Sequence, residues 1–368
     1  MSIKLKIRQL AKMLLQNCLL PFIYFLNSRG KIEKGLVLFA DAHHNDCPFS
    51  MRVMRKKIAK MGNMHIKEFY LDFSKCGKLQ MARFILDFMT AFGRAEYVFI
   101  CDTFLPVSSC KKRRETFVTQ LWHSCGLLKK AGYDSKDCVP AFYKGEVFGG
   151  YDLWTVSAEC VAPIMAESMH QKRENVKALG VSRTDIYYSK KYNELCREKF
   201  FKAHPDALGR TVVLWAPTFR GNAAEPFVVG EEIIEQVCRA RGWYLIKKLH
   251  PHMQQDDGFP TERLFAVADI LVTDYSSVFF DYANLRRPII YYMYDMDYYR
   301  DGLRGFYLSL DELPGPIVKE EDGLIASIRD LSENFQVDEK YRAFNDKFNY
   351  LDDGNATKRV IEKIFFSK

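Results

Sequence analysis

The 368-residue sequence lacks the short motifs that mark several large enzyme classes. It has no Walker-type phosphate loop, no GxGxxG fingerprint and no GxSxG nucleophile turn. These absences argue against a P-loop NTPase, a dinucleotide oxidoreductase of the usual kind and an α/β-hydrolase.

Metal-binding patterns are missing as well. The ten cysteines form no CxxC pair and no zinc-type spacing with histidine, so a structural metal has little support. Several of them, such as Cys101 and Cys238, lie in apolar runs, and we expect buried free thiols in a reducing compartment. Asp295 and Asp297 are spaced as in a DxD motif, but they lie in a tyrosine-rich stretch and are expected to be structural.

The N-terminus has no apolar core followed by a small-residue cleavage site, which predicts a cytoplasmic chain. Residues 1–27 nevertheless mix apolar side chains with four basic ones, Lys4, Lys6, Arg8 and Lys12. These charges and Pro21 limit the uninterrupted apolar part to well under the ~20 residues that a spanning helix needs. Two interpretations remain open: an interfacial helix on an anionic membrane, or an amphipathic helix packed on the protein's own surface.

Strand-like apolar runs alternate with amphipathic stretches of helix length, the pattern of parallel sheets with crossover helices. With 48% hydrophobic residues the chain can bury a large core, and its length favours two α/β domains. We predict strands at residues 36–40, 66–72, 97–101, 118–122, 153–157, 211–216, 243–247, 270–273 and 288–292. A charged helix and loop within residues 190–210 would separate a first domain, 28–189, from a second, 190–368, that ends in helices.

The formal net charge is +8, and the basic residues are spread along the chain. A basic surface facing anionic lipid or a phosphorylated substrate explains this charge as well as nucleic acid does. We therefore expect no nucleic-acid partner.

The most informative stretch is ADILVTDYSSVFFDY, residues 268–282. An apolar strand ends at Thr273 in a polar turn with Ser276 and Ser277, and an apolar helical pattern follows. Backbone N–H groups, hydroxyls and the helix dipole at such a turn suit a phosphate. Asp281, one turn into the helix, could accept hydrogen bonds from ribose hydroxyls or cap a neighbouring backbone.

Other polar groups also follow predicted strands, where α/β proteins bind ligands. His123 is placed for proton transfer, with Lys129 adding positive charge nearby; the alternative is a histidine hydrogen-bonded in a loop. His250 could balance the charge of a diphosphate or belong to a solvated basic strand end. Arg220 could fork onto two phosphate oxygens or be a surface arginine.

At these residues the chain resembles the CDP-glycerol glycerophosphotransferase family, which builds teichoic acids and related polyol-phosphate polymers. The resemblance covers roughly residues 95–300 in five ordered segments: QLWHSCGLLKKAGYD (120–134), GVSRTDIYY (180–188), LWAPTFRG (214–221), KKLHPH (247–252) and VTDYSSVFFDYANLRRPIIYYMYD (272–295). It implies a GT-B fold, two Rossmann-like domains facing each other across a cleft, with metal-independent transfer at the inner face of the membrane.

The resemblance also implies roles for residues. The first domain would receive a lipid-linked or polymer acceptor, with His123 as the base that deprotonates its hydroxyl. The second would hold CDP-glycerol or CDP-ribitol, with His250 stabilising the diphosphate. The family's phosphate-binding positions are matched by Arg220, Thr273, Ser276 and Ser277.

Two departures leave the acceptor and the polyol open. Ser124 stands where the family usually has glycine, and residues 40–52 differ from the asparagine-rich form of glycerol-specific members. His43 and His44 in that segment could contact the acceptor or be ordinary loop histidines. The expected activity is polyol-phosphate transfer with release of CMP, in teichoic acid or capsule synthesis. The alternatives are a GT-B glycosyltransferase that uses a nucleotide sugar, and a catalytically silent membrane-bound scaffold.

Overall fold

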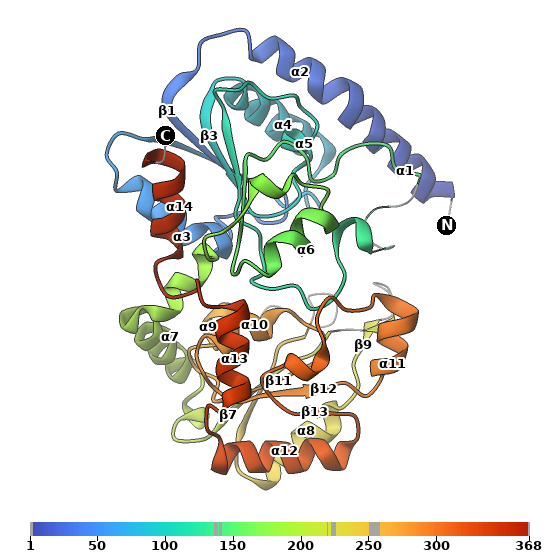
Figure 1. Cartoon of the computed structure of the whole chain (residues 1–368), viewed down its shortest axis with the longest axis vertical. Coiled ribbons are helices and arrows are strands. Elements are labelled where there is room, and N and C mark those ends of the chain that lie inside the picture. Colours follow the sequence, from blue (N-terminus) through green and yellow to red (C-terminus); the bar gives the residue numbers. More distant parts are fainter. Residues whose placement is uncertain are drawn as a thin grey trace. The chain divides into compact units, whose positions relative to one another are not determined.

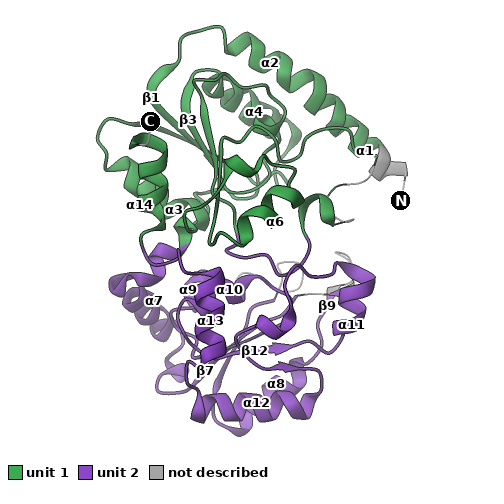
Figure 2. Ribbon diagram, in the orientation of Figure 1, with its two compact units in different colours: residues 1–123, 131–183, 355–368 green, residues 124–130, 184–354 purple. Residues whose placement is uncertain are grey.

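The structure, a computed structural model, describes residues 3–135, 139, 142–218, 220–221, 226–249 and 258–366. The chain forms two units, shown in Figure 2. Unit 1 comprises Met1–His123, Ala131–Arg183 and Asn355–Lys368, and unit 2 comprises Ser124–Lys130 and Thr184–Gly354. Each unit is built around its own parallel sheet, so the predicted α/β class with two Rossmann-like units is confirmed.

Unit 1 contains a six-stranded sheet in the order β2-β1-β3-β4-β5-β6. Its central strand β1 has five consecutive side chains, residues 36–40, that are each at most 1% exposed. A strand buried on both faces needs such a continuous apolar run, because helices cover both sides of a parallel sheet. The strands are β1 (Glu33–Asp41), β2 (His65–Tyr70), β3 (Ala95–Ile100), β4 (Phe117–Gln120), β5 (Leu153–Val156) and β6 (Val176–Ala178).

The helices of unit 1 surround this sheet (Figure 1). In α4 the residues Ile85, Phe88 and Phe92 recur at helical spacing, and all three are buried, as their periodicity predicts. The helices are α1 (Ile3–Leu14), α2 (Leu20–Asn27), α3 (Phe49–Ala59), α4 (Lys78–Phe92), α5 (Leu105–Ser108), α6 (Val161–Ser168) and α14 (Ala356–Ile361).

The N-terminal helix is longer than the sequence-based limit allowed. A π-helical segment, Leu15–Leu19, joins α1 to α2, and this widened turn directly before Pro21 lets the helix continue through a residue that has no N–H to donate. Gln9–Asn27, 19 residues with a mean hydropathy of 1.2, is therefore long and apolar enough to cross a membrane by length and composition alone. The helix as a whole therefore meets a criterion that the expectation denied it, although Lys12, Gln16 and Asn17 still interrupt its apolar run.

One face of this helix nevertheless packs on unit 1. Gln16, Leu20 and Tyr24 recur every fourth residue and are at most 4% exposed. The Gln16 amide donates to the carbonyl of Glu146 at 2.5 Å, and the Tyr24 hydroxyl accepts from the backbone N–H of Arg113 at 3.0 Å. The opposite face exposes large apolar side chains. Packing on the protein's own surface, one of the two open interpretations, is thus present, and an apolar face remains uncovered.

Unit 2 contains a five-stranded sheet in the order β10-β7-β11-β12-β13. Alternate residues of β7, β11 and β12 pack with α8 and α12 in one buried cluster, including Val213, Val272 and Ile290. On the other face, Phe279 and Phe280 of α10 contact Phe344 of α13. The strands are β7 (Val212–Ala216), β10 (Tyr244–Lys247), β11 (Ile270–Thr273), β12 (Ile289–Tyr292) and β13 (Ile317–Val318), with a short hairpin of β8 (Arg220–Gly221) and β9 (Pro226–Phe227).

The charged segment 190–210 forms α7 and a short loop, but α7 packs on unit 2 and does not stand apart as a linker. The Arg197 guanidinium donates to the carbonyl of Ala266 at 3.2 Å. The last helix differs from the predicted domain plan, because α14 packs with unit 1: the Arg359 guanidinium donates to the carbonyl of Leu179. The helices of unit 2 are α7 (Lys190–Ala203), α8 (Glu231–Ala240), α9 (Thr261–Leu264), α10 (Val278–Ala283), α11 (Met296–Tyr298), α12 (Glu321–Asn334) and α13 (Glu339–Phe348).

Gly126 allows the segment Ser124–Lys130 to lie against the core of unit 2. A Cβ added at this position would lie 2.1 Å from Cε1 of Phe280, whose side chain is fully buried. We expect Gly126→Ala to destabilise the protein by about 1–3 kcal/mol, because the ring has no room to move. Urea denaturation measures this effect, with Gly30→Ala as the matched control, since nothing lies within 4 Å of a Cβ at Gly30. Equal stability of the two variants would contradict the packing.

Candidate functional site

In each unit the candidate polar residues lie at the carboxyl ends of the strands, near the topological switch point of the sheet. In unit 1, β2 is added on one side of β1 and β3 on the other, so the order of the strands switches direction between β1 and β3. In unit 2 the same reversal occurs between β7 and β11. Loops at the carboxyl ends of such strand pairs separate and leave room for a ligand. Of the predicted site residues, His43 and His44 follow β1, Arg220 follows β7, and Ser276 and Ser277 follow β11, whereas His123 follows β4, the neighbour of β3.

His123 lies beside an aspartate of unit 1. Its Nδ1 lies 3.3 Å from Oδ2 of Asp102 and 3.3 Å from the carbonyl oxygen of Cys101. A carbonyl oxygen can only accept, so Nδ1 carries the proton and Nε2 keeps its lone pair. The side chain is 46% exposed. This arrangement gives His123 the tautomer of a general base and an accessible ring.

The backbone around His123 is held on several sides. Trp122 has a φ of 56°, in the left-handed region that is costly for a large side chain, and its ring is buried against Trp154. The buried Gln120 amide accepts from the N–H of Trp122 and donates to the carbonyl of Asp102, both at 3.0 Å. The Arg183 guanidinium donates to the carbonyl of His123. These contacts fix the orientation of the ring relative to Asp102.

His43 and His44 lie in the same cluster. The imidazole Nε2 of His43 is 3.9 Å from Oδ1 of Asp102, and Nδ1 of His44 is 2.8 Å from Oδ2 of Asp41. The hydrogen bond to Asp41 raises the pKa of His44 against the opposing effect of burial. Burial alone would raise the pKa of Asp41, but its bonds to His44 and to the N–H of His43 outweigh burial and lower it. His43 and His123 therefore lie on the two oxygens of the same carboxylate, and His44 is bonded to Asp41.

We expect Asp102→Asn to lower kcat by roughly 100-fold, because the amide can offer Nδ1 of His123 a donor and so favour the wrong tautomer. The KM for the donor should change little, since Asp102 belongs to unit 1. Steady-state kinetics of the full chain checks this expectation. Asp87→Asn, on the exposed face of α4, is the control that should behave as wild type. A kcat within a few-fold of wild type in Asp102→Asn would count against the pair.

In unit 2, Arg220 is not a surface arginine, because its side chain is only 6% exposed. Its Nε and Nη2 donate to both oxygens of Asp295 at 2.6 and 3.0 Å, and Nη2 also reaches Asp274 at 3.2 Å. Nη1 donates to the carbonyl of Thr218 at 2.6 Å. The predicted fork is present, but it binds a carboxylate of the protein. A phosphate would have to replace that carboxylate.

Aromatic rings enclose this ion pair. The guanidinium carbon of Arg220 lies 5.0 to 5.5 Å from the ring centroids of Tyr275, Tyr294 and Tyr299. Burial raises the pKa of Asp274 in spite of the nearby positive charge. Burial alone would also raise the pKa of Asp295, but the hydrogen bond and the charge of Arg220 outweigh burial and lower the pKa of that carboxyl. Asp295, expected to be structural, anchors the guanidinium.

Of the residues predicted to bind the donor in and around the turn after β11, some are accessible to a ligand and others are buried. Ser276 and Ser277 are partly exposed, with Ser277 immediately before α10, so their hydroxyls lie where the sequence predicts. Thr273 is buried, and its hydroxyl donates to the carbonyl of Ala216 at 2.7 Å, which leaves no hydrogen for a phosphate. Asp281 is 1% exposed. Access to a ribose would therefore require the groups that cover Asp281 to move.

The basic groups after β10 are only partly visible. His250 lies outside the described residues. Lys247 donates to Glu231 at 2.7 Å and to Glu235 at 2.8 Å, so its charge is balanced by α8. Lys129, predicted for the acceptor side, belongs to unit 2, where its backbone forms an isolated antiparallel β-bridge with Phe306. Its charge helps to stabilise the Asp274 carboxylate against burial.

Within the described ranges, no group of three or more His, Cys, Asp or Glu side chains could hold a metal ion. The nine cysteines that the structure describes are all free, as expected, and Cys101 and Cys238 are buried.

Sequence reasoning missed the carboxylates of the site. Asp102 comes directly after the predicted strand 97–101, and Asp41 directly after 36–40. The rule that selected His123 would have found both, because carboxyl ends of parallel strands meet at one edge of a sheet. Arg183 lies in the segment GVSRTDIYY, but nothing in the sequence indicates that it contacts the backbone of His123.

Comparisons with known proteins identify the relatives of this chain. The family model of CDP-Glycerol:Poly(glycerophosphate) glycerophosphotransferase matches residues 22–366. A teichoic acid poly(ribitol-phosphate) polymerase of Bacillus spizizenii is 28% identical over 96% of this chain, which spans 60% of that relative's length. A teichoic acid ribitol-phosphate primase of the same organism is 27% identical, covering 90% of this chain and 91% of the primase. A teichoic acid glycerol-phosphate primase of Bacillus subtilis is 31% identical over 73% of each chain.

The fold has a solved counterpart. A variant of the wall teichoic acid polymerase TagF, with a histidine changed to asparagine, superposes with a TM-score of 0.76 and 20% identity over 97% of each chain. This likeness assigns the two Rossmann-like units to the GT-B fold. The family match over most of the sequence and the order of its segments lead to one conclusion: the chain belongs to the CDP-glycerol:poly(glycerophosphate) glycerophosphotransferase family.

Proposed function

We propose that this protein transfers a polyol phosphate from a CDP-activated donor to a hydroxyl of a lipid-linked or polymer acceptor, in teichoic acid or capsule synthesis. The observation that carries the proposal is the contact between Nδ1 of His123 and the carboxylate of Asp102 in a chain of this family. Glycerol phosphate is the polyol we expect first. CDP-ribitol is the second donor to test, because relatives named for ribitol phosphate and for glycerol phosphate match at similar identity.

We assign binding and deprotonation of the acceptor to unit 1. In unit 1, Nε2 of His123 takes the proton of the acceptor hydroxyl, and Asp102 stabilises the imidazolium that forms. The acceptor oxygen then attacks the β-phosphorus, the bond from that phosphorus to the bridging oxygen breaks, and CMP leaves with this oxygen. His43 and His44 are assigned to the acceptor.

Unit 2 is assigned to the donor. We assign charge stabilisation at the diphosphate to His250, Arg220, Ser276 and Ser277, with Asp281 on the nucleotide side. Lys129 adds positive charge near Asp274. Thr273 is assigned to holding β11 beside β7, because its hydroxyl is already bonded. With these groups we expect transfer to need no metal, so excess EDTA should leave the rate unchanged.

A donor panel tests the proposal. Wild-type protein is incubated with an acceptor and with CDP-glycerol, CDP-ribitol or a UDP-sugar, and the released nucleotide is identified. CMP from a CDP-polyol supports the proposal. UDP from a UDP-sugar would replace it with a glycosyltransferase, and nucleotide binding without release across varied acceptors would favour a scaffold.

We also propose that the protein is cytoplasmic and works on the inner face of the membrane. The outer face of the N-terminal helix exposes Ile7, Leu10, Leu14, Phe22 and Phe25 by 56–65% each. Such a row of apolar side chains suits insertion into an anionic lipid surface.

We expect Leu14→Ser to weaken binding to vesicles that contain phosphatidylglycerol by roughly tenfold, because a leucine no longer leaves water on binding. Co-sedimentation of the full chain measures the change. Leu79→Ser on α4, where the leucine is 85% exposed, is the control and should bind as wild type. If both variants bind equally well, the membrane surface is elsewhere.

A further inference from the structure

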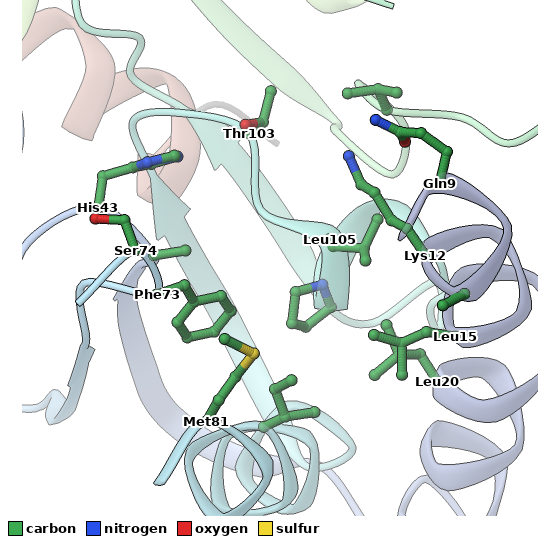
Figure 3. Close-up of a pocket in the computed structure, with 15 residues that line it drawn as sticks. Gln9, Lys12, Leu15, Leu20, His43, Phe73, Ser74, Met81, Thr103 and Leu105 are labelled. Carbon is green, nitrogen blue, oxygen red and sulfur yellow. The ribbon is translucent and has the colours of Figure 1, made fainter. Parts of the chain in front are cut away.

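A cavity of about 590 Å³ lies in unit 1 between the N-terminal helix and the carboxyl ends of β1 and β3. Its volume is within the range of ligand sites and far above that of a packing defect. The helix contributes Gln9, Ala11, Lys12 and Leu15 on one side. Figure 3 shows His43 and Phe73 on the opposite side.

The lining changes character along the cavity. In Figure 3 the labelled polar side chains Gln9, Lys12, His43 and Thr103 lie towards one end. In the same view the apolar side chains Leu15, Leu20, Phe73 and Met81 lie towards the other end. A site with a long apolar part and a few polar groups at one end fits a ligand of the same design, an apolar chain that carries a polar head.

The polar end lies beside the histidine cluster. His43 lines the cavity and is 3.9 Å from Asp102, which is paired with His123. Thr103, the next residue after Asp102, lines it too. The Lys12 ammonium lies 5.1 Å from the Tyr143 ring and brings positive charge to this end. A head with a phosphate and a hydroxyl would therefore meet the Lys12 ammonium and the imidazole of His43 together.

The other face of the same helix carries the exposed apolar row described above. A helix with one face towards lipid and the other towards a cavity offers an apolar chain a short path from the bilayer into the protein. This arrangement favours an occupant that comes from the membrane over one dissolved in water.

We propose that this cavity binds the apolar chain of the acceptor, an isoprenoid or alkyl chain joined through phosphate to the hydroxyl-bearing group. The inference rests on the proposed function, which supplies the acceptor. Binding of the chain would hold the acceptor hydroxyl near His123 and would favour acceptors with long chains over water-soluble ones.

Binding of farnesyl phosphate to the full chain, measured by calorimetry without any CDP donor, tests the site. Wild type should bind one molecule, with a negative heat-capacity change, and should bind isopentenyl phosphate roughly tenfold more weakly or worse. Ala11→Trp, which fills the cavity from the helix, should lose roughly tenfold in affinity for farnesyl phosphate. Val147→Phe fills it from another segment and should act alike.

Leu79→Ser is the matched control, because Leu79 lies on α4, which lines the cavity through Met81 and Ile85, but does not line the cavity itself. It should bind farnesyl phosphate as wild type. Equal affinity for the two probes, wild-type binding by both filled variants, or displacement of the probe by phosphatidylglycerol would overturn the inference, the last by assigning the cavity to a membrane lipid. If farnesyl phosphate binds as expected but no acceptor is ever modified, the proposed function fails and the chain-binding site stands.

Discussion

We expect His123→Ala to lower the rate of CMP release by about 100-fold to 10,000-fold, the range that a positioned general base contributes. This loss corresponds to about 3–5 kcal/mol of transition-state stabilisation. The reason is local: Nε2 of His123 is the atom that the Cys101 carbonyl and Asp102 leave unprotonated. Without it, the acceptor hydroxyl must lose its proton to water.

The control for this prediction is His65→Ala, since His65 is an exposed histidine on β2. His123 is 46% exposed, so its removal creates no large cavity and the variant should unfold at the wild-type urea concentration. The KM for the donor should be nearly unchanged. A folded His123→Ala variant that releases CMP at the wild-type rate would remove His123 from the mechanism.

The second large effect is on stability. We expect Arg220→Ala to destabilise the protein by about 3–5 kcal/mol, because Asp295 and Asp274 would be left buried without their positive partner. Their side chains are only 15% and 4% exposed. Arg220→Lys should recover part of the loss, since an ammonium keeps the charge but cannot donate two parallel hydrogen bonds to Asp295.

A double-mutant cycle separates the pair from its surroundings. In the background of Asp295→Asn, the further change Arg220→Ala should cost clearly less than it does in wild type, because one of the two orphaned charges is already gone. Urea denaturation followed by fluorescence gives the free energies of unfolding. A cost below about 1 kcal/mol for Arg220→Ala would show that the ion pair is not buried as the structure has it.

Much of the fold could be predicted because parallel strands are continuous apolar runs. All nine predicted strands correspond to strands of the structure, whereas β6 and β13 are only three and two residues long and carry too little pattern to be recognised. Pro21 was expected to interrupt the N-terminal apolar stretch, but the π-helical turn before it lets the helix continue.

The sequence predicts where the site residues lie better than it predicts which side chains they contact. His43 and His44 follow β1 and His123 follows β4, and the carboxyl ends of these parallel strands lie at one edge of the sheet. What the sequence could not reveal is which charges neutralise each other. Arg220 is satisfied by Asp295, which is 75 residues away, and Lys247 by glutamates of α8. Such pairings depend on the tertiary fold and have no local pattern.

The most direct test of the account is the identity and amount of nucleotide released from CDP-glycerol and CDP-ribitol in the presence of an acceptor. Attack at the β-phosphorus predicts CMP in a one-to-one ratio with new phosphodiester, only when an acceptor is present, and almost none with His123→Ala. Release of CDP would mean that the acceptor attacks the polyol carbon that is bonded to the diphosphate, and this would contradict the account. So would CMP release that needs neither acceptor nor His123.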